Sequence, residues 1–190
     1  MLRSFTSVGG LLKSLINPMS HDYPWYGIIS PGESFEQGDF IEDCPVLVPS
    51  SNPVSPDQQM PVEVVTTNVV IMSQSCDLKD GDIEFVLACP VASAEGLGLG
   101  REKLETIRKG SRPAYHMVKN CDLHDAPDFS KTCQIVDFRN VYSIEFSFLK
   151  KFASSKPRLR LLPPYREHLS QAFARFFMRV GLPSDIPSFK

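Results

Sequence analysis

No stretch of this sequence approaches the roughly 20 consecutive apolar residues that a membrane-spanning helix requires. Basic residues are not in excess either, because 22 Asp and Glu outnumber 20 Lys and Arg and give a formal net charge of -2. Without a general positive field, any site for nucleic acid or another polyanion must be a local patch. A signal peptide with a cleavage site is also missing. These absences predict a soluble, cytoplasmic protein without a membrane partner.

The five cysteines lack the paired spacing of zinc ribbons and zinc fingers. Their odd number and irregular spacing favour reduced thiols over a disulfide framework. One group of side chains is still a candidate for a metal site, namely Cys121, His124 and Cys133 with His116 or Asp122 as a fourth ligand. We expect these side chains to be ordinary buried or loop residues instead. The sequence therefore predicts neither a metal site nor a cofactor.

Many short strands are indicated by the 16 prolines and 11 glycines, which are scattered without a period. A chain of 190 residues that is 42% hydrophobic can bury the core of one domain. Strands are predicted at residues 38–48, 62–65, 69–73, 83–91, 114–119, 134–138 and 141–148. An Asp-Gly turn before residue 83 predicts that 69–73 and 83–91 are antiparallel neighbours. The fold class is therefore expected to be mainly β, of the α+β type.

Two helices interrupt and close this β-rich pattern. The first is a short helix over residues 101–109, ended by Gly110. The second follows Pro163-Pro164 and ends at Gly181, with an apolar stripe of Leu169, Ala172, Phe173, Phe176, Phe177 and Val180. This amphipathic stripe is typical of a helix that packs on the core. A second stripe of His168, Gln171, Arg175 and Arg179 predicts a solvated face, with a phosphate-contacting surface as the alternative.

The ends and loops of the chain complete the predicted organisation. Residues 1–35 form an N-terminal arm, whose first 17 residues have helical apolar spacing typical of a short helix docked on the body or on a partner subunit. Residues 36–162 form the β-rich body, in which 49–61 is an exposed proline-rich loop. Residues 163–182 contain the closing helix. Together they make a single domain over residues 1–190.

A cluster of small polar side chains follows the buried strand at Val69 to Met72. Its members are Ser73, Gln74, Ser75, Cys76 and Asp77. Rigid scaffold meets loop at a strand exit, and binding groups are often presented there. We expect Asp77 to accept hydrogen bonds in a turn, and Gln74 and Ser75 to be free for a ligand.

The same cluster offers a catalytic alternative. Cys76 and Asp77 could act as nucleophile and base if His116 or His124 lowered the pKa of the thiol. No triad spacing supports this hypothesis, so we expect Cys76 to pack as a small apolar group.

Several short motifs occur in a recognisable order. Gly38-Asp39 opens the first strand, Val69 to Ser73 reads Val-Val-Ile-Met-Ser, and Cys89-Pro90-Val91 ends the next strand. Val136-Asp137, Val141 to Ile144 and Gly181-Leu182 follow. In this order the chain resembles toxins of the MazF and PemK family over roughly residues 36 to 182. The resemblance implies a small SH3-like β-barrel with a terminal helix, a homodimer and metal-free cleavage of single-stranded RNA.

The catalytic residues of that family are not retained. Thr67-Asn68 stands where active members usually have Arg-Pro, and Ala92, with Ser93 after it, stands where they tend to have a hydroxyl. Loss of a charge stabiliser lowers the rate by orders of magnitude. The sequence therefore favours a non-catalytic binding module for nucleic acid or a partner protein, with a ligand site at Asp39 and residues 73–77. The alternative is an endoribonuclease toxin in which Arg112 and His116 replace the missing groups.

Overall fold

The structure is a computed structural model that describes residues 23–49, 61–81, 83–122, 126 and 129–178. Several predictions fall outside these residues, namely the N-terminal helix, nearly all of the proline-rich loop, His124, Arg179, Val180 and Gly181. Within the described residues, no helix is both long and apolar enough to span a membrane.

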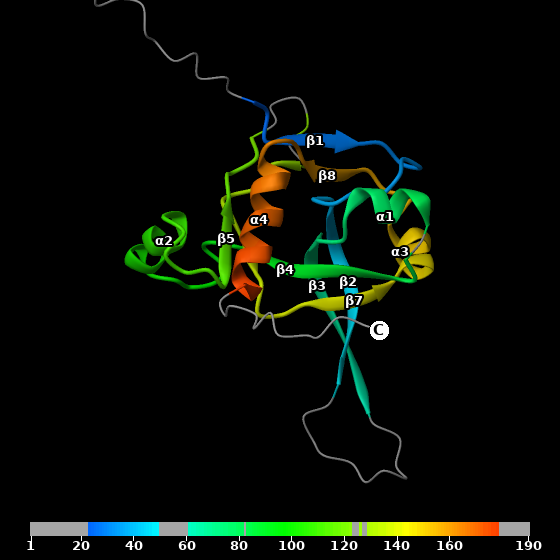
Figure 1. Cartoon of the computed structure of the whole chain (residues 1–190), viewed down its shortest axis with the longest axis horizontal. Helices are drawn as coiled ribbons and strands as arrows, with labels where there is room; N and C mark the ends of the chain where they lie inside the picture. The colour runs from blue at the N-terminus through cyan, green and yellow to red at the C-terminus, as the bar shows by residue number, and fades with distance from the viewer. Residues whose placement is uncertain (1–22, 50–60, 82, 123–125, 127–128, 179–190) are drawn as a thin grey trace, which may run out of the picture.

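The described residues contain two antiparallel sheets (Figure 1). The smaller sheet pairs β1 (Tyr26–Ile29) with β8 (Arg158–Leu161). The larger sheet has the order β2-β3-β4-β6-β5, and β7 also pairs with β4. Its strands are β2 (Phe40–Pro49), β3 (Val62–Ile71), β4 (Phe85–Ser93), β5 (Tyr115–Val118), β6 (Gln134–Asp137) and β7 (Tyr142–Glu145). The mainly β, α+β class is confirmed.

A closed barrel is not formed by the described strands. The two sheets are joined by one isolated bridge between Asp39 and Arg160 and by the backbone N–H of Leu161, which donates to the Gly38 carbonyl at 2.9 Å. The SH3-like barrel is therefore not confirmed by this arrangement.

Both faces of the larger sheet are covered, because alternate residues of its central strands enter two separate cores. Ile71 and Val86 pack on one face beneath α3 (Phe146–Ala153), whose Leu149 is fully buried. Val70 and Cys89 belong to the other core, which α4 (Tyr165–Phe177) closes through Leu169.

The two predicted helices are confirmed. The shorter one is α2 (Arg101–Arg108), with Ile107 buried against Ile135 and a left-handed Gly110 (φ 68°) turning the chain back after it. The apolar stripe of α4 covers the core through Leu169, as predicted. Phe177, at the last turn, is 60% exposed and lies outside the core.

Four segments differ from their predicted structure. β3 is one continuous strand, because Thr66 and Thr67 stay paired with Pro45 and Cys44 of β2. The predicted strand 141–148 ends at Glu145, after which α3 begins. β1 and β8 were not predicted.

The antiparallel pairing of β3 with β4 is confirmed, but their connection is not a simple turn. It contains a short helix, α1 (Ser75–Asp80), which ends at the left-handed Gly81 (φ 75°). Asp77 therefore lies in the first turn of a helix, and its predicted place in a turn is wrong.

Candidate functional site

Asp39, the first of the predicted ligand-binding residues, is completely buried. Its carboxylate accepts hydrogen bonds from Nε of Arg158 at 2.7 Å and from Nη2 of Arg160 at 2.9 Å. The guanidinium groups occupy both carboxylate oxygens. Asp39 therefore links the two sheets and exposes no oxygen to a ligand.

The two serines of the polar cluster hold the exit of β3 in place. Ser73 Oγ accepts a hydrogen bond from the backbone N–H of Leu87 at 2.8 Å. Ser75 Oγ accepts one from the backbone N–H of Gln37 at 3.1 Å, and Gln37 Nε2 donates to the Met72 carbonyl at 2.7 Å. These side chains satisfy backbone groups that would otherwise lose their partners.

The remaining three members of the cluster are exposed. Gln74 Nε2 lies 3.5 Å from Ser170 Oγ of α4, and the Cys76 thiol donates to Asp77 at 3.3 Å. No hydrogen bond joins Cys76 to a histidine in the described part of the chain. The endoribonuclease alternative would bring Arg112 and His116 to this cluster, but His116 belongs to β5, which lies on the other side of α4 from α1 (Figure 1), and Arg112 precedes β5 by three positions. The structure does not bring the predicted site together.

His116 instead contributes to a groove that α2, β5 and α4 enclose. The groove has a volume of about 390 Å³. The polar and charged side chains that define it, here called the basic groove, are Arg108, Lys109, His116, His168, Gln171 and Arg175. His116 thus lines the same groove as three residues of the second α4 stripe, although it is far from them in sequence.

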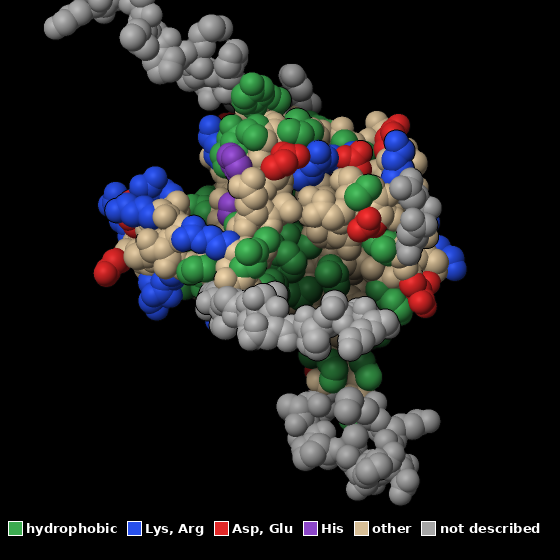
Figure 2. Space-filling model, viewed as in Figure 1, with side chains coloured by type: hydrophobic (Ala, Val, Ile, Leu, Met, Phe, Trp, Pro, Cys, Tyr) green, Lys and Arg blue, Asp and Glu red, His purple; other side chains and the backbone are tan. Residues whose placement is uncertain are grey.

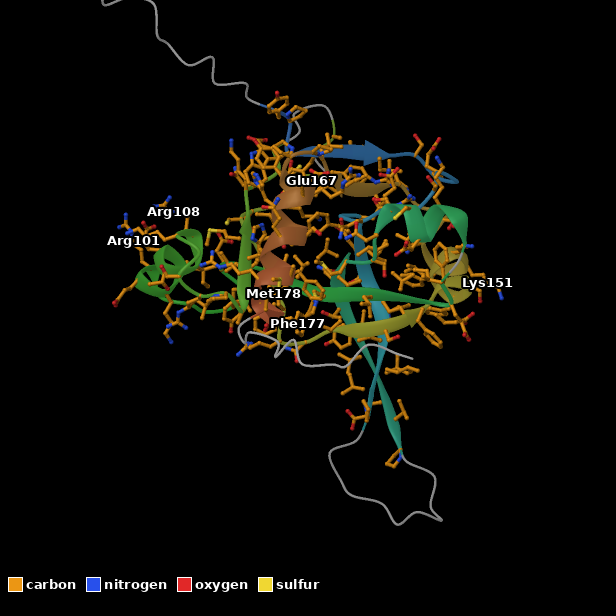
Figure 3. The ribbon with its side chains drawn as sticks, viewed as in Figure 1. Arg101, Arg108, Lys151, Glu167, Phe177 and Met178 are labelled. Atoms are coloured by element: carbon orange, nitrogen blue, oxygen red, sulfur yellow. The ribbon has the colours of Figure 1, made fainter. Side chains whose placement is uncertain are left out.

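The surroundings of the basic groove are positively charged although the whole chain is acidic. Residues 101–119 hold six Lys or Arg and two Glu, a net charge of +4. One of these acids, Glu105, is already paired with Arg108 at 2.6 Å and Lys109 at 3.5 Å, and hydrogen bonding to Arg108 is the main reason that its pKa falls to about 2. Figure 2 shows Lys and Arg side chains gathered over α2, with histidines beside them, and Figure 3 labels Arg101 and Arg108 there.

The two histidines of the groove have different surroundings. His116 is half-buried, and its ring lies 6.3 Å from the Phe138 ring, nearly parallel to it. Burial, with a smaller contribution from nearby His168, lowers the pKa of His116 to about 4. At neutral pH the His116 imidazole is uncharged and offers one donor and one acceptor. His168 is exposed on α4.

Aromatic rings lie beside the groove at the start of α4. Tyr165 stacks on Trp25 with ring centroids 3.6 Å apart, and its other neighbour is His168, edge-on at 6.0 Å. Trp25 in turn lines an open hollow of about 490 Å³ together with Tyr23 and Lys119. This second hollow shares no lining residue with the basic groove, and the ring contacts of Trp25, Tyr165 and His168 connect the two.

The metal alternative gains no support from the described residues, which contain no group of three His, Cys, Asp or Glu able to hold a metal ion. Cys121 is buried and forms an isolated bridge with Lys131. Burial raises the pKa of both Cys121 and Cys133, which disfavours the thiolates that zinc requires.

Sequence reasoning placed the α4 stripe and His116 separately and did not select Arg108 and Lys109. The charge of +4 within residues 101–119 was a visible signal for them, since the rest of the chain is acidic. Comparison with protein-family models finds no match for this chain, and comparison with curated proteins finds no significant one.

Proposed function

We propose that this protein is a non-catalytic binding module for single-stranded RNA and that the RNA binds in the basic groove. One observation carries the proposal: Arg108 at the end of α2 and Lys109 directly after it converge with Arg175 of α4 on a single groove that also holds His116. These residues come from segments that are up to 67 positions apart, from 108 to 175, so the fold itself gathers the charge.

The charges of the groove suit a phosphate backbone. Arg175 forms no ion pair with any residue that the structure describes, so its guanidinium is available to an anion. Gln171 and neutral His116 add donors and acceptors that can reach sugar hydroxyls and phosphate oxygens. A local basic surface of this kind is what an acidic protein needs to bind a polyanion.

The neighbouring aromatic rings suit unpaired bases. Bases of single-stranded nucleic acid stack on Trp, Tyr and His rings, and each stacked base contributes about 1–3 kcal/mol. The exposed Tyr23 and the half-buried Trp25 line the neighbouring hollow, which the ring contacts of Tyr165 connect to His168 of the groove. A strand of several nucleotides can thus have its phosphates at α2 and α4 and its bases against these rings.

Two observations favour binding without cleavage. The resemblance to the MazF and PemK toxins points to single-stranded RNA, but Thr67-Asn68 and Ala92 replace the catalytic groups of that family. A histidine with a pKa of about 4 is also a weak general base at neutral pH. The endoribonuclease alternative would require His116 to act as the general base from within the basic groove.

Fluorescence anisotropy with labelled single-stranded RNA of mixed sequence tests the proposal. Lys109→Gln and Arg175→Gln should each weaken binding several-fold. Each should also lower, by about one, the number of phosphate contacts that the salt dependence of binding reports. The matched control is Lys151→Gln, which removes the same charge on α3, at the opposite side of the molecule (Figure 3).

Three results would contradict the proposal. The first is no binding by the unmodified protein at low salt, and the second is an equal loss in the Lys151→Gln variant. The third is shortening of the RNA, measured on a denaturing gel after incubation, which would support the endoribonuclease alternative. A single-stranded DNA of the same sequence shows whether the 2′-hydroxyl contributes.

A further inference from the structure

The hairpin of β2 and β3 projects from the body and leaves one strand edge open (Figure 1). β3 pairs with β2 over most of its length, but it pairs with β4 only through Val69 to Ile71. Residues 62–68 of β3 therefore have no strand on their second side among the residues that the structure describes. An unpaired edge of this kind is a template for another strand.

The two outer edges of this hairpin differ in their ability to hydrogen-bond to another strand, as the pairing register of β2 and β3 shows. Pro45 faces Thr66 and Pro49 faces Val62. Facing pairs of an antiparallel ladder alternate between bonded and non-bonded, and proline has no N–H to donate. Both prolines therefore occupy non-bonded positions and block the outer edge of β2.

The same alternation fixes the other edge. Because Val62 and Thr66 belong to non-bonded pairs, they and Val64 direct their N–H and C=O groups away from β2. No proline interrupts β3. The hairpin is thus blocked on one edge and open on the other.

Apolar side chains surround the open edge. Leu47 is 70% exposed, Val64 is 66% exposed and Val62 is 51% exposed. Leu47 and Val64 also line a hollow of about 370 Å³ that reaches Phe148 of α3. Contiguous exposed apolar surface of this kind marks an interaction site.

We infer that β3 of a second copy of this chain docks on this edge, antiparallel to the first, so that the two larger sheets become one. Antiparallel pairing about a two-fold axis is self-complementary, which suits a homodimer. With the axis at Val65, the middle of the open segment, Val64 faces Thr66 and Glu63 faces Thr67 of the second copy. Glu63 is the only charged residue of β3, so no like charges oppose each other.

The proposed dimer is tested by light scattering after size exclusion over a range of concentrations. The unmodified protein should approach twice the chain mass of 21.3 kDa as its concentration rises. Val64→Pro removes an N–H from the open edge only and should shift the protein to monomer. Leu47→Pro is the matched control, because Leu47 faces Val64 in the ladder and has its N–H on the edge that the prolines already block.

A cross-link tests the axis without relying on a proline. Facing residues of a non-bonded pair have Cα atoms about 4.5 Å apart, within the range of a disulfide. Val65→Cys, in a Cys76→Ser background that removes the exposed native thiol, should form a disulfide-linked dimer, whereas Val62→Cys should not. Monomer at every concentration, or a dimer that Val64→Pro leaves intact, would overturn the inference. RNA binding by the basic groove is measured independently of these outcomes.

Discussion

His116 shows how one residue links the groove to the stability of the fold. Its ring lies against Phe138, which is fully buried, and its pKa is lowered to about 4. An ordinary histidine has a pKa of 6.5. Protonation therefore favours the unfolded chain, in which the imidazole is solvated, over the folded one.

We expect the folded state to lose stability as the pH falls from about 6.5 toward 4. The contribution of His116 is complete above pH 6.5, and its loss by pH 4 should be roughly 2–3 kcal/mol after allowance for the exposed part of the ring. Urea denaturation at several pH values measures it, and His116→Gln should flatten the profile. His168→Gln should keep most of the pH dependence, because burial is the larger cause. A profile unchanged by His116→Gln would contradict this account.

At the scale of the elements, α4 contributes to both the core and the groove. Phe173 packs edge-on against Phe138 with ring centroids 5.3 Å apart, whereas Phe177 projects from the last turn (Figure 3). A second stripe at the edge of the apolar one carries His168, Gln171 and Arg175 into the basic groove. Changes on the core side should therefore affect stability before they affect binding.

Phe173→Ala should lower the free energy of unfolding by about 2–4 kcal/mol, since it removes a large side chain from a packed cluster. Phe177→Ala should cost less than about 1 kcal/mol, because that ring is mostly exposed and its ring contacts are with Phe173 and the partly buried Phe176. Chemical denaturation of both variants compares them directly. Equal losses would show that the end of α4 is packed as tightly as its middle.

Hydrophobic periodicity could predict the helices that bury one side in the core and expose the other side to solvent. α2 and α4 have clear apolar stripes, and their bounds were predicted to within a few residues. Residues 146–148 fit both a strand and a helix, because Phe146 and Leu149 are also three apart and both buried. Periodicity alone cannot separate the two structures over so short a segment.

β8 was missed for a different reason. Arg158 and Arg160 are buried, and a buried arginine is rare unless a partner neutralises it. That partner, Asp39, lies about 120 positions earlier in the chain. A large separation in sequence also explains why the candidate site was not predicted as a whole. His116 and the α4 stripe were each identified, but nothing in the local sequence indicates that they share a groove.

At the scale of the whole molecule, a buried ion network joins elements that also share one hydrophobic core. Asp39 binds Arg158 and Arg160, and Glu36 binds Arg160 at 3.0 Å and Arg166 of α4 at 2.9 Å. The network thereby connects β8, the start of β2 and α4. Groups at its centre lie far from water, so each depends on its partners.

Asp39→Asn should lower the free energy of unfolding by about 3–5 kcal/mol, because it leaves the buried Arg158 guanidinium without a counter-charge among the described residues and Arg160 with the partly exposed Glu36 alone. Arg166→Ala, at the partly exposed end of the network, should cost about 1 kcal/mol or less. Thermal and chemical denaturation measure both variants. A mild effect of Asp39→Asn would mean that the two arginines find other partners.

The pairing of β1 with β8 also has a consequence for how the chain is made. Tyr26 lies opposite Leu161, 135 residues later in the chain. At a synthesis rate of about 5 to 20 residues per second, roughly 7 to 27 s separate the emergence of the two strands from the ribosome. During that interval β2, β3 and β4 can assemble, while β1 waits without a partner and Asp39 stays in water. The first described strand to be synthesised is thus among the last to be placed, and the nascent chain buries its central carboxylate only when the two arginines of β8 arrive.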